Sequence, residues 1–168
     1  FMNTTQKTSK SLIKKESKKL FRTIASLIDS SRRRVEKNVN AELTLLNWQI
    51  GKHIDETLAA IESAYGMEIV ATLSQQLMDV FGKGYTISAL SRIRQFYLFF
   101  PKQKIVATLS QLLSWSHFVE LSNVKNGLAR SYYTELCRIE HWSVRELRER
   151  IGSMLYERTA ISKKPEKL

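Results

Sequence analysis

Residues 69–101 read IVATLSQQLMDVFGKGYTISALSRIRQFYLFFP and contain the signals that decide the fold. Up to Phe81, apolar side chains recur every three or four residues, as they do on one face of an α-helix. Gly82 and Gly84 interrupt the pattern, and a second helical pattern stops at Phe100 because Pro101 forces the preceding residue out of helical geometry. The stretch therefore predicts two helices joined by a glycine turn, the second N-capped by Thr86 or Ser88.

Helical spacing also extends along most of the remaining chain. Between Leu12 and Ile54 the apolar period is near 3.6, with one interruption at Ser30 and Ser31. This pattern predicts a short basic helix followed by a long one over residues 32–64, which Gly66 would end as a C-cap. Further helices are expected over 105–113, 116–122, 127–140 and 143–157, the last opened by a capping box of Ser143 and Glu146.

The sequence thus favours a compact all-α domain of several helices, with a helix-turn-helix-like unit and a long N-terminal helix. Residues 1–11 are expected to form a flexible arm, residues 12–161 the helical domain, and residues 162–168 a linker or frayed tail. Among 168 residues, six glycines and two prolines are too few for a β-sandwich or barrel rich in tight turns.

Several compartments and classes of site are disfavoured by composition. No uncharged apolar run is long enough for a transmembrane helix, and the first residues lack the features of a signal peptide. Cys137 is the single cysteine, which excludes an internal disulfide and a zinc site built from cysteines. We expect a cytoplasmic protein that does not enter a membrane.

The charge distribution points to a polyanionic partner. Lysine and arginine outnumber aspartate and glutamate by 27 to 16, a net charge of +11. Residues 1–37 hold eleven of the basic and three of the acidic side chains, and no acid lies between Asp79 and Glu120. Such a positive potential attracts nucleic acid, and also acidic proteins or anionic lipid.

The second helix of the opening stretch has a polar side suited to DNA. At about 100° per residue, Leu90, Ile93 and Tyr97 fall on one side of this helix. The opposite side carries Ser88, Ser91, Arg92 and Gln95 together with Phe99. Arginine pairs well with guanine and glutamine with adenine in the major groove, so this side is the candidate reading face. A plain helical hairpin with a solvated polar face is the alternative.

Further cations are candidate phosphate contacts. They are Lys83 in the turn, Arg94 at the border of the polar side, Lys102 and Lys104 beyond the helix, and Arg32, Arg33 and Arg34 in the expected first turn of the long helix. A solvated charge run is an equally good interpretation of the three arginines. The DNA hypothesis requires Lys83, Arg92, Arg94, Lys102 and Lys104 to converge on a single ridge.

No catalytic site is expected. His53, His117 and His141 have no second ligand at metal-binding spacing, and Cys137 has no neighbouring base. The chain has no phosphate-binding glycine loop. We therefore expect no metal site and no cofactor.

A series of motifs over about residues 24–162 resembles the N-terminal helical domain of YhcG-like proteins. In order they are Leu46-Asn47-Trp48-Gln49-Ile50-Gly51, Tyr65-Gly66, Leu73-Ser74, Phe81-Gly82-Lys83-Gly84-Tyr85, Ile93-Arg94-Gln95-Phe96-Tyr97, Phe100-Pro101, Leu113-Ser114-Trp115-Ser116-His117, Trp142-Ser143-Val144-Arg145-Glu146-Leu147 and Tyr156-Glu157-Arg158-Thr159-Ala160-Ile161-Ser162.

The resemblance implies a mostly helical domain that binds DNA through a helix-turn-helix-like part and, in full-length members, precedes a PD-(D/E)xK nuclease domain. None of the catalytic residues of that nuclease domain has a counterpart here. The expected function is a non-enzymatic, nuclease-associated module that binds duplex DNA, with a homodimer through residues 32–64 and a nuclease domain or partner as possible associates. The alternative is a module for protein interaction or oligomerisation that uses residues 32–64 as its surface. A weaker alternative places the helix over residues 12–28 on an anionic membrane.

Overall fold

The structure, a computed structural model, describes residues 2–33 and 39–162, with the backbone alone for residues 2–8 and 33. Every regular element in these two ranges is helical, which confirms the expected all-α fold. The elements in chain order are α1 (Met2–Arg33), α2 (Val39–Ala59), α3 (Ser63–Phe81), the 3₁₀ turn η1 (Lys83–Tyr85), α4 (Ile87–Phe99), α5 (Gln103–Leu109), α6 (Trp115–Asn123), α7 (Gly127–Glu140), α8 (Val144–Gly152) and α9 (Leu155–Ser162).

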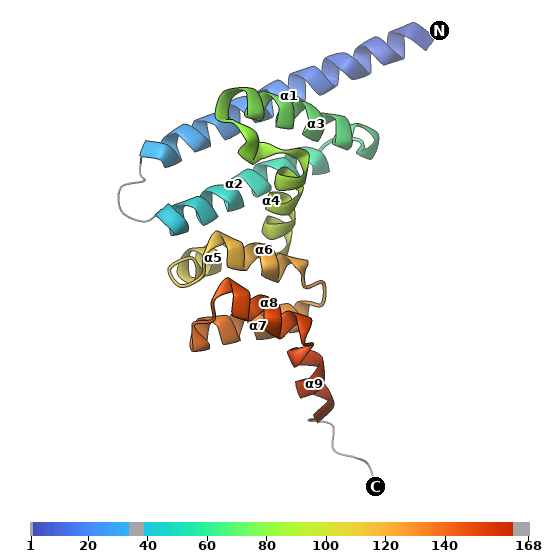
Figure 1. Cartoon of the computed structure of the whole chain (residues 1–168). Coiled ribbons are helices and arrows are strands. Elements are labelled where there is room, and N and C mark those ends of the chain that lie inside the picture. The colour runs from blue at the N-terminus through green and yellow to red at the C-terminus, as the bar shows by residue number, and fades with distance from the viewer. Residues whose placement is uncertain (1, 34–38, 163–168) are drawn as a thin grey trace.

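Two groups of helices are stacked along the molecule, and α4 joins them (Figure 1). Helices α1, α2 and α3 form the first group, and α4 runs from it toward α5 and α6. Helices α7 and α8 pack beyond α6, and α9 leads away toward the C-terminus. The fold thus places η1 and the start of α4 beside the first group and the end of α4 beside the second.

The first hydrophobic cluster lies between α1, α2, α3 and α4. Helix α1 contributes Ile13, Leu20, Ile24 and Ile28, which are at most 7% exposed and repeat at helical spacing. Full burial of each such side chain stabilises the fold by roughly 1.5–3 kcal/mol. The basic helix is therefore an integral part of the domain.

The second cluster lies between the end of α4 and helices α5 to α8. Phe96 of α4 is fully buried among the rings of Phe100, Trp115 and Phe118, with centroid separations of 5.7, 5.1 and 5.0 Å. Trp48 of α2 joins this cluster and donates a hydrogen bond from Nε1 to the carbonyl of Phe100, at 2.7 Å. Helices α2 and α4 thus contribute to both clusters.

The two N-terminal helices differ from the sequence-based expectation. Helix α1 runs from Met2, so residues 2–11 are helical where a flexible arm was expected, and Ser30 and Ser31 lie inside the helix. The helix continues through both serines because, once a helix is nucleated, each further residue adds a backbone hydrogen bond. Ser31 also donates its hydroxyl to Glu42 Oε1 of α2 at 3.2 Å. Helix α1, which was expected to be short, spans 32 residues, whereas α2, which was expected to be long, spans 21.

Two further boundaries also differ. Gly66 lies inside α3 and not at the end of a helix, because α2 already stops at Ala59. The helix expected over 143–157 is divided into α8 and α9 at Met154, whose φ of 54° is left-handed. Ser162 ends α9, and the rest of the expected tail lies outside the described residues.

Helix α2 is enclosed by its neighbours. It contacts α1, α3, α4, α5 and α6, and its side chains between Thr44 and Asp55 are buried or partly exposed, with that of Lys52 at 42%. The main length of this helix therefore offers only partly exposed side chains to the interaction or dimer surface expected on residues 32–64. A homodimer stays a prediction.

Candidate nucleic-acid interface

The glycine turn and the N-cap fix the start of α4. Gly82 has a φ of +89°, a left-handed conformation that favours glycine, and η1 follows it directly. Ser74 of α3 donates its hydroxyl to the carbonyl of Tyr85 at 2.8 Å, which ties η1 to α3. Thr86 then caps α4 by accepting a hydrogen bond from the backbone N–H of Ala89 at 3.2 Å, as the sequence predicts.

The first half of α4 presents a free polar face. Ser88, Ser91 and Arg92 are exposed, and no hydrogen bond or ion pair of their side chains occurs within the described part of the chain. At about 100° per residue the three side chains lie within one third of the helix circumference. They can approach the same ligand.

Arg94 and Gln95 are instead engaged with neighbouring helices. The guanidinium of Arg94 contacts Asp55 Oδ1 of α2 through Nε at 2.9 Å and through Nη2 at 2.8 Å. The side-chain amide of Gln95 donates a hydrogen bond to the carbonyl of Ser122 in α6. The expectation that Gln95 reads bases is therefore not supported by its position, because α6 occupies the side on which it projects. Arg94 is compensated by an acid of the same domain.

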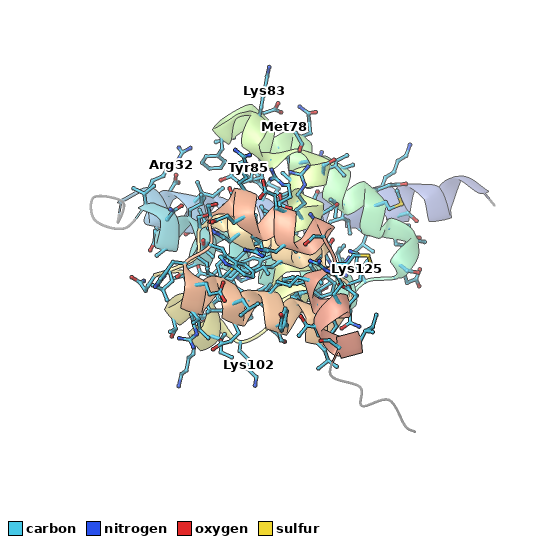
Figure 2. The ribbon with its side chains drawn as sticks, turned by 60° about the horizontal axis from the view of Figure 1, so that its bottom comes forward. Arg32, Met78, Lys83, Tyr85, Lys102 and Lys125 are labelled. Atoms are coloured by element: carbon cyan, nitrogen blue, oxygen red, sulfur yellow. The ribbon has the colours of Figure 1, made fainter. Side chains whose placement is uncertain are left out.

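Three exposed cations from three elements, Arg32, Lys83 and Arg92, lie near Tyr85. Arg32, near the end of α1, lies 5.1 Å from the ring centroid of Phe81, and Lys83 projects from η1 (Figure 2). Burial raises the pKa of the Tyr85 hydroxyl, while the positive charge of Arg32 acts in the opposite direction. Arg92 lines a hollow of about 220 Å³ together with Gly84 and Tyr85. We call Arg32, Lys83, Ser88, Ser91 and Arg92 the Tyr85 surface.

Lys102 and Lys104 do not join this surface. Both follow the C-terminal end of α4, whereas Lys83 precedes its N-terminal end. Figure 2 shows Lys83 and Lys102 projecting from opposite sides of the molecule. The predicted single ridge is therefore wrong, because a helix of 13 residues, about 20 Å long, separates its two halves.

Arg32 also lies in a different place from the one expected. It occupies the last turn of α1 and not the first turn of the next helix, so its charge complements the helix dipole. The side chain of Arg33 and all of Arg34 lie outside the described residues.

The outward face of α1 is a second basic surface. It carries six exposed cations, Lys10, Lys14, Lys15, Lys18, Lys19 and Arg22. The described part of the structure shows no ion pair for any of them. In the sequence these cations belong to the excess of basic residues over residues 1–37. The four-residue spacing of Lys10, Lys14, Lys18 and Arg22 shows in addition that these cations share one helix face.

The membrane alternative is not supported by α1. Ile13, Leu20, Ile24 and Ile28, which would have to enter the lipid, are buried in the first cluster. Over the described residues, no helix has the length and apolar character needed to cross a membrane.

The structure also shows the surroundings of Cys137 and His117, two of the side chains that the sequence offers for chemistry. No group of three or more His, Cys, Asp or Glu side chains within them could hold a metal ion. Burial, and secondly the charge of Glu146, raise the pKa of the Cys137 thiol to about 12. His117 bonds Ser114 through Nδ1 and the carbonyl of Trp142 through Nε2 at 2.8 Å, so Nε2 carries the proton and the imidazole joins α6 to the turn before α8. These two side chains have structural roles.

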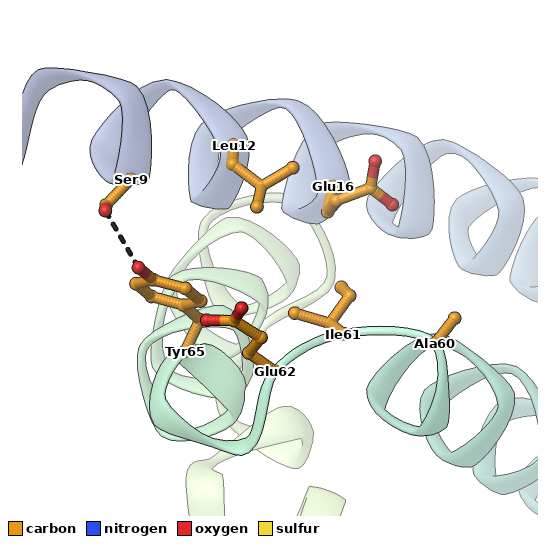
Figure 3. Close-up of a pocket in the computed structure, with 7 residues that line it drawn as sticks. All are labelled: Ser9, Leu12, Glu16, Ala60, Ile61, Glu62 and Tyr65. Atoms are coloured by element: carbon orange, nitrogen blue, oxygen red, sulfur yellow. Dashed lines mark hydrogen bonds between the residues drawn. The ribbon is translucent and has the colours of Figure 1, made fainter. Parts of the chain in front are cut away.

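A hollow of about 570 Å³ lies between α1 and the junction of α2 with α3 (Figure 3). The hydroxyls of Ser9 and Tyr65 are hydrogen-bonded across it at 2.9 Å. Its two carboxylates, Glu16 and Glu62, make it unsuited to a polyanion.

Comparisons with known proteins identify the family of this chain. The model of the DUF1016 N-terminal domain matches residues 23–158. A protein of Escherichia coli K12 named "Putative nuclease YhcG" is 33% identical over 170 residues, which cover 83% of this chain and 45% of that protein. The chain thus spans less than half the length of this relative. No solved structure matches. Because both matches cover most of its length, the chain belongs to the DUF1016 N-terminal domain family, and YhcG of E. coli is one of its relatives.

Proposed function

We propose that this domain binds duplex DNA through the Tyr85 surface, in the manner of a helix-turn-helix module, and catalyses no reaction itself. The observation that carries the proposal is the free polar face at the start of α4, together with two exposed cations of other elements near Tyr85. Ser88, Ser91 and Arg92 form that face, and Arg92 lines a hollow with Tyr85, the residue near which Arg32 and Lys83 also lie. A surface that only kept the protein soluble would not require these cations to come from three separate elements.

Each of these side chains has a definite role on DNA. Arg92 can donate two hydrogen bonds to the O6 and N7 atoms of guanine, and the hydroxyls of Ser88 and Ser91 can donate or accept at base edges. Lys83 and Arg32 would contact phosphates and thereby fix the orientation of α4 on the duplex. Arg94 and Gln95 would support α4 through Asp55 and Ser122.

The basic face of α1 extends the positive surface toward Arg32. Lys14 and Arg32 are 18 residues apart, which is five turns at 3.6 residues per turn, so they project from the same side of α1. Lysines along this side would attract the phosphate backbone without reading its sequence. The proposal therefore assigns attraction to α1 and base contacts to α4.

The family supports this proposal. The relative in E. coli is named as a nuclease, and a nuclease needs a means of holding its nucleic acid substrate. A DNA-binding domain joined to a nuclease domain, or acting with a nuclease partner, would raise the local concentration of substrate. We accordingly assign this chain the binding role.

The test measures binding of a labelled duplex by fluorescence anisotropy at several salt concentrations. For the intact protein we expect the affinity to fall steeply as the salt concentration rises. Each phosphate contact contributes about −0.9 to the slope of log K, the logarithm of the association constant, against the logarithm of the salt concentration. The variant Lys83→Glu/Arg92→Glu should bind at least about tenfold more weakly and with a slope smaller by about 1 for each lost phosphate contact. All these side chains are exposed, so circular dichroism should be unchanged.

Lys102→Glu/Lys104→Glu is the matched control, because it changes the net charge by the same amount at exposed positions beyond the other end of α4. Equal weakening by both variants would contradict the assigned surface. Failure of the intact protein to bind any duplex at low salt would contradict the function itself.

A further inference from the structure

The end of α4 displays an apolar surface whose apolar side chains the proposed DNA contacts do not use. Two hollows meet at the ring of Phe99, which lines both of them. The first, of about 370 Å³, lies between α4, α5 and α7, and its apolar lining is formed by Phe99, Phe100, Pro101, Ile105 and Leu109. The second, of about 340 Å³, has an apolar lining of Ile54, Leu58, Val70, Leu90, Leu98 and Phe99. We call the two hollows together the Phe99 groove.

This groove is rimmed by cations without acidic partners. Arg130 lies 4.0 Å from the centroid of the Phe99 ring, and Lys125 Nζ lies 5.5 Å from the same centroid. Lys102 lines the first hollow. Within the part of the chain that the structure describes, none of these three cations is paired with an acid.

The acids near the groove are already neutralised. Glu135 lines the first hollow and is hydrogen-bonded to Arg138, which lowers the pKa of the Glu135 carboxyl. In the second hollow the charged side chains are Arg94, which is paired with Asp55, and Lys125, which is not paired with an acid in the described residues. The groove therefore keeps a net positive rim, supplied by Lys102, Lys125 and Arg130.

We propose that the Phe99 groove binds an acidic amphipathic segment of a protein, with one apolar side chain in each hollow and carboxylates against the rim. Helical segments with apolar anchors on one side commonly occupy such grooves. Leu98 and Ile105 at the groove are 48% and 49% exposed, so an apolar anchor would remove them from water. The groove shares Ser91 with the Tyr85 surface and none of its cations, and the inference does not depend on DNA binding.

Charge and shape together favour protein over nucleic acid here. A phosphate backbone would satisfy the three cations and leave both apolar hollows without a filling group. A base could stack on Phe99 only by displacing Arg130, whose Nη1 also donates to the carbonyl of Val124 at 2.7 Å. An acidic segment with apolar anchors satisfies the rim and the lining at once.

The experiment uses fluorescein-labelled helical peptides rich in glutamate. Each peptide of the panel has two leucines that are three, four or seven positions apart, because residues at these spacings lie on the same face of a helix. We expect at least one peptide to bind the full chain in anisotropy measurements, and the same peptide with serines in place of the leucines to bind at least about tenfold more weakly. Absence of binding by the whole panel would overturn the proposal.

Variants of the groove locate the site. Leu98→Ser/Ile105→Ser and, separately, Lys102→Glu should each weaken peptide binding at least about tenfold, whereas Lys83→Glu should leave it unchanged. The replaced side chains are on the surface, and an unchanged melting temperature would verify the fold. Peptide binding that Leu98→Ser/Ile105→Ser does not weaken would reduce the interaction to charge attraction and overturn the proposal. A single-stranded oligonucleotide whose binding this double substitution abolishes would assign the groove to nucleic acid instead.

Discussion

Gly51 allows the two central helices to approach each other closely. A Cβ atom at this position would lie 2.5 Å from the carbonyl oxygen of Ile93 and 2.9 Å from Cβ of Tyr97. Both neighbours belong to α4, and a backbone carbonyl cannot rotate away as a flexible side chain can. The absence of a side chain at Gly51 thus sets the position of α4 against α2, and with it the position of the Tyr85 surface.

Replacing Gly51 by alanine should destabilise the protein although alanine has the higher helix propensity. The propensity gain is about 1 kcal/mol, whereas overpacking a filled helix contact costs about 1–3 kcal/mol. We expect a net loss in the free energy of unfolding, measured by chemical denaturation. Gly152→Ala is the control, because nothing lies within 4 Å of its added Cβ. Equal stability of the two variants would show that α2 and α4 can separate without cost.

At the scale of the element, α8 is held by a capping box. Glu146 accepts a hydrogen bond from the backbone N–H of Ser143 at 2.7 Å and another from its hydroxyl at 2.9 Å, and in return its own N–H donates to the hydroxyl of Ser143 at 3.2 Å. The bond from the Ser143 backbone, followed by that from its hydroxyl, lowers the pKa of the Glu146 carboxyl below its ordinary value of 4.5. The ionised carboxylate therefore stabilises the folded state.

The contribution of Glu146 should depend on pH in a defined direction. Because its pKa is lower in the folded state than in the unfolded state, the stabilisation is present above pH 4.5 and is lost as the pH falls through the folded-state pKa. We expect Glu146→Gln to lower the free energy of unfolding at neutral pH and to differ less from the unsubstituted protein in strong acid. Glu149→Gln, in the same helix, is the control, because its carboxylate contacts Arg145 and does not cap the helix. A deficit of equal size at both pH values would show that the carboxylate charge is not involved.

Elements whose ends carry local signals were predictable from the sequence, and those set by distant partners were not. The capping box of Ser143 and Glu146 and the stop before Pro101 identify helix boundaries within a few residues of chain. The end of α1 carries no such signal, since the helical spacing continues past Ser31, whose partner Glu42 lies on the next helix. The outward positions of Ser88, Ser91 and Arg92 followed from helix periodicity. The engagement of Arg94 and Gln95 required knowledge of α2 and α6, because periodicity gives a direction and not the neighbour that lies there.

At the scale of the whole molecule, the two hydrophobic clusters share helices. Helix α2 contributes Ile50 to the first cluster and Trp48 to the second, and α4 likewise contributes Ile93 and Phe96. Neither cluster can lose its packing without displacing a helix that supports the other. The two clusters should therefore unfold as one cooperative unit, although they are stacked along the molecule.

Leu73→Ala tests this coupling. Leu73 is fully buried in the first cluster, so its truncation should cost about 2–5 kcal/mol. Of the three tryptophans, Trp48 and Trp142 lie in the second cluster, which this substitution does not touch, and Trp115 packs against both clusters. We expect the unfolding transition measured by tryptophan fluorescence to shift together with that measured by far-ultraviolet circular dichroism, because coincident transitions are the mark of two-state unfolding. Leu147→Ala, which truncates a side chain of the second cluster, should likewise shift the two transitions together. The contrary outcome is that Leu73→Ala moves the circular dichroism transition and leaves the fluorescence transition in place. In that case α2 and α4 would be hinges between two independent units. The Tyr85 surface and the Phe99 groove would then lie on parts that can fold separately.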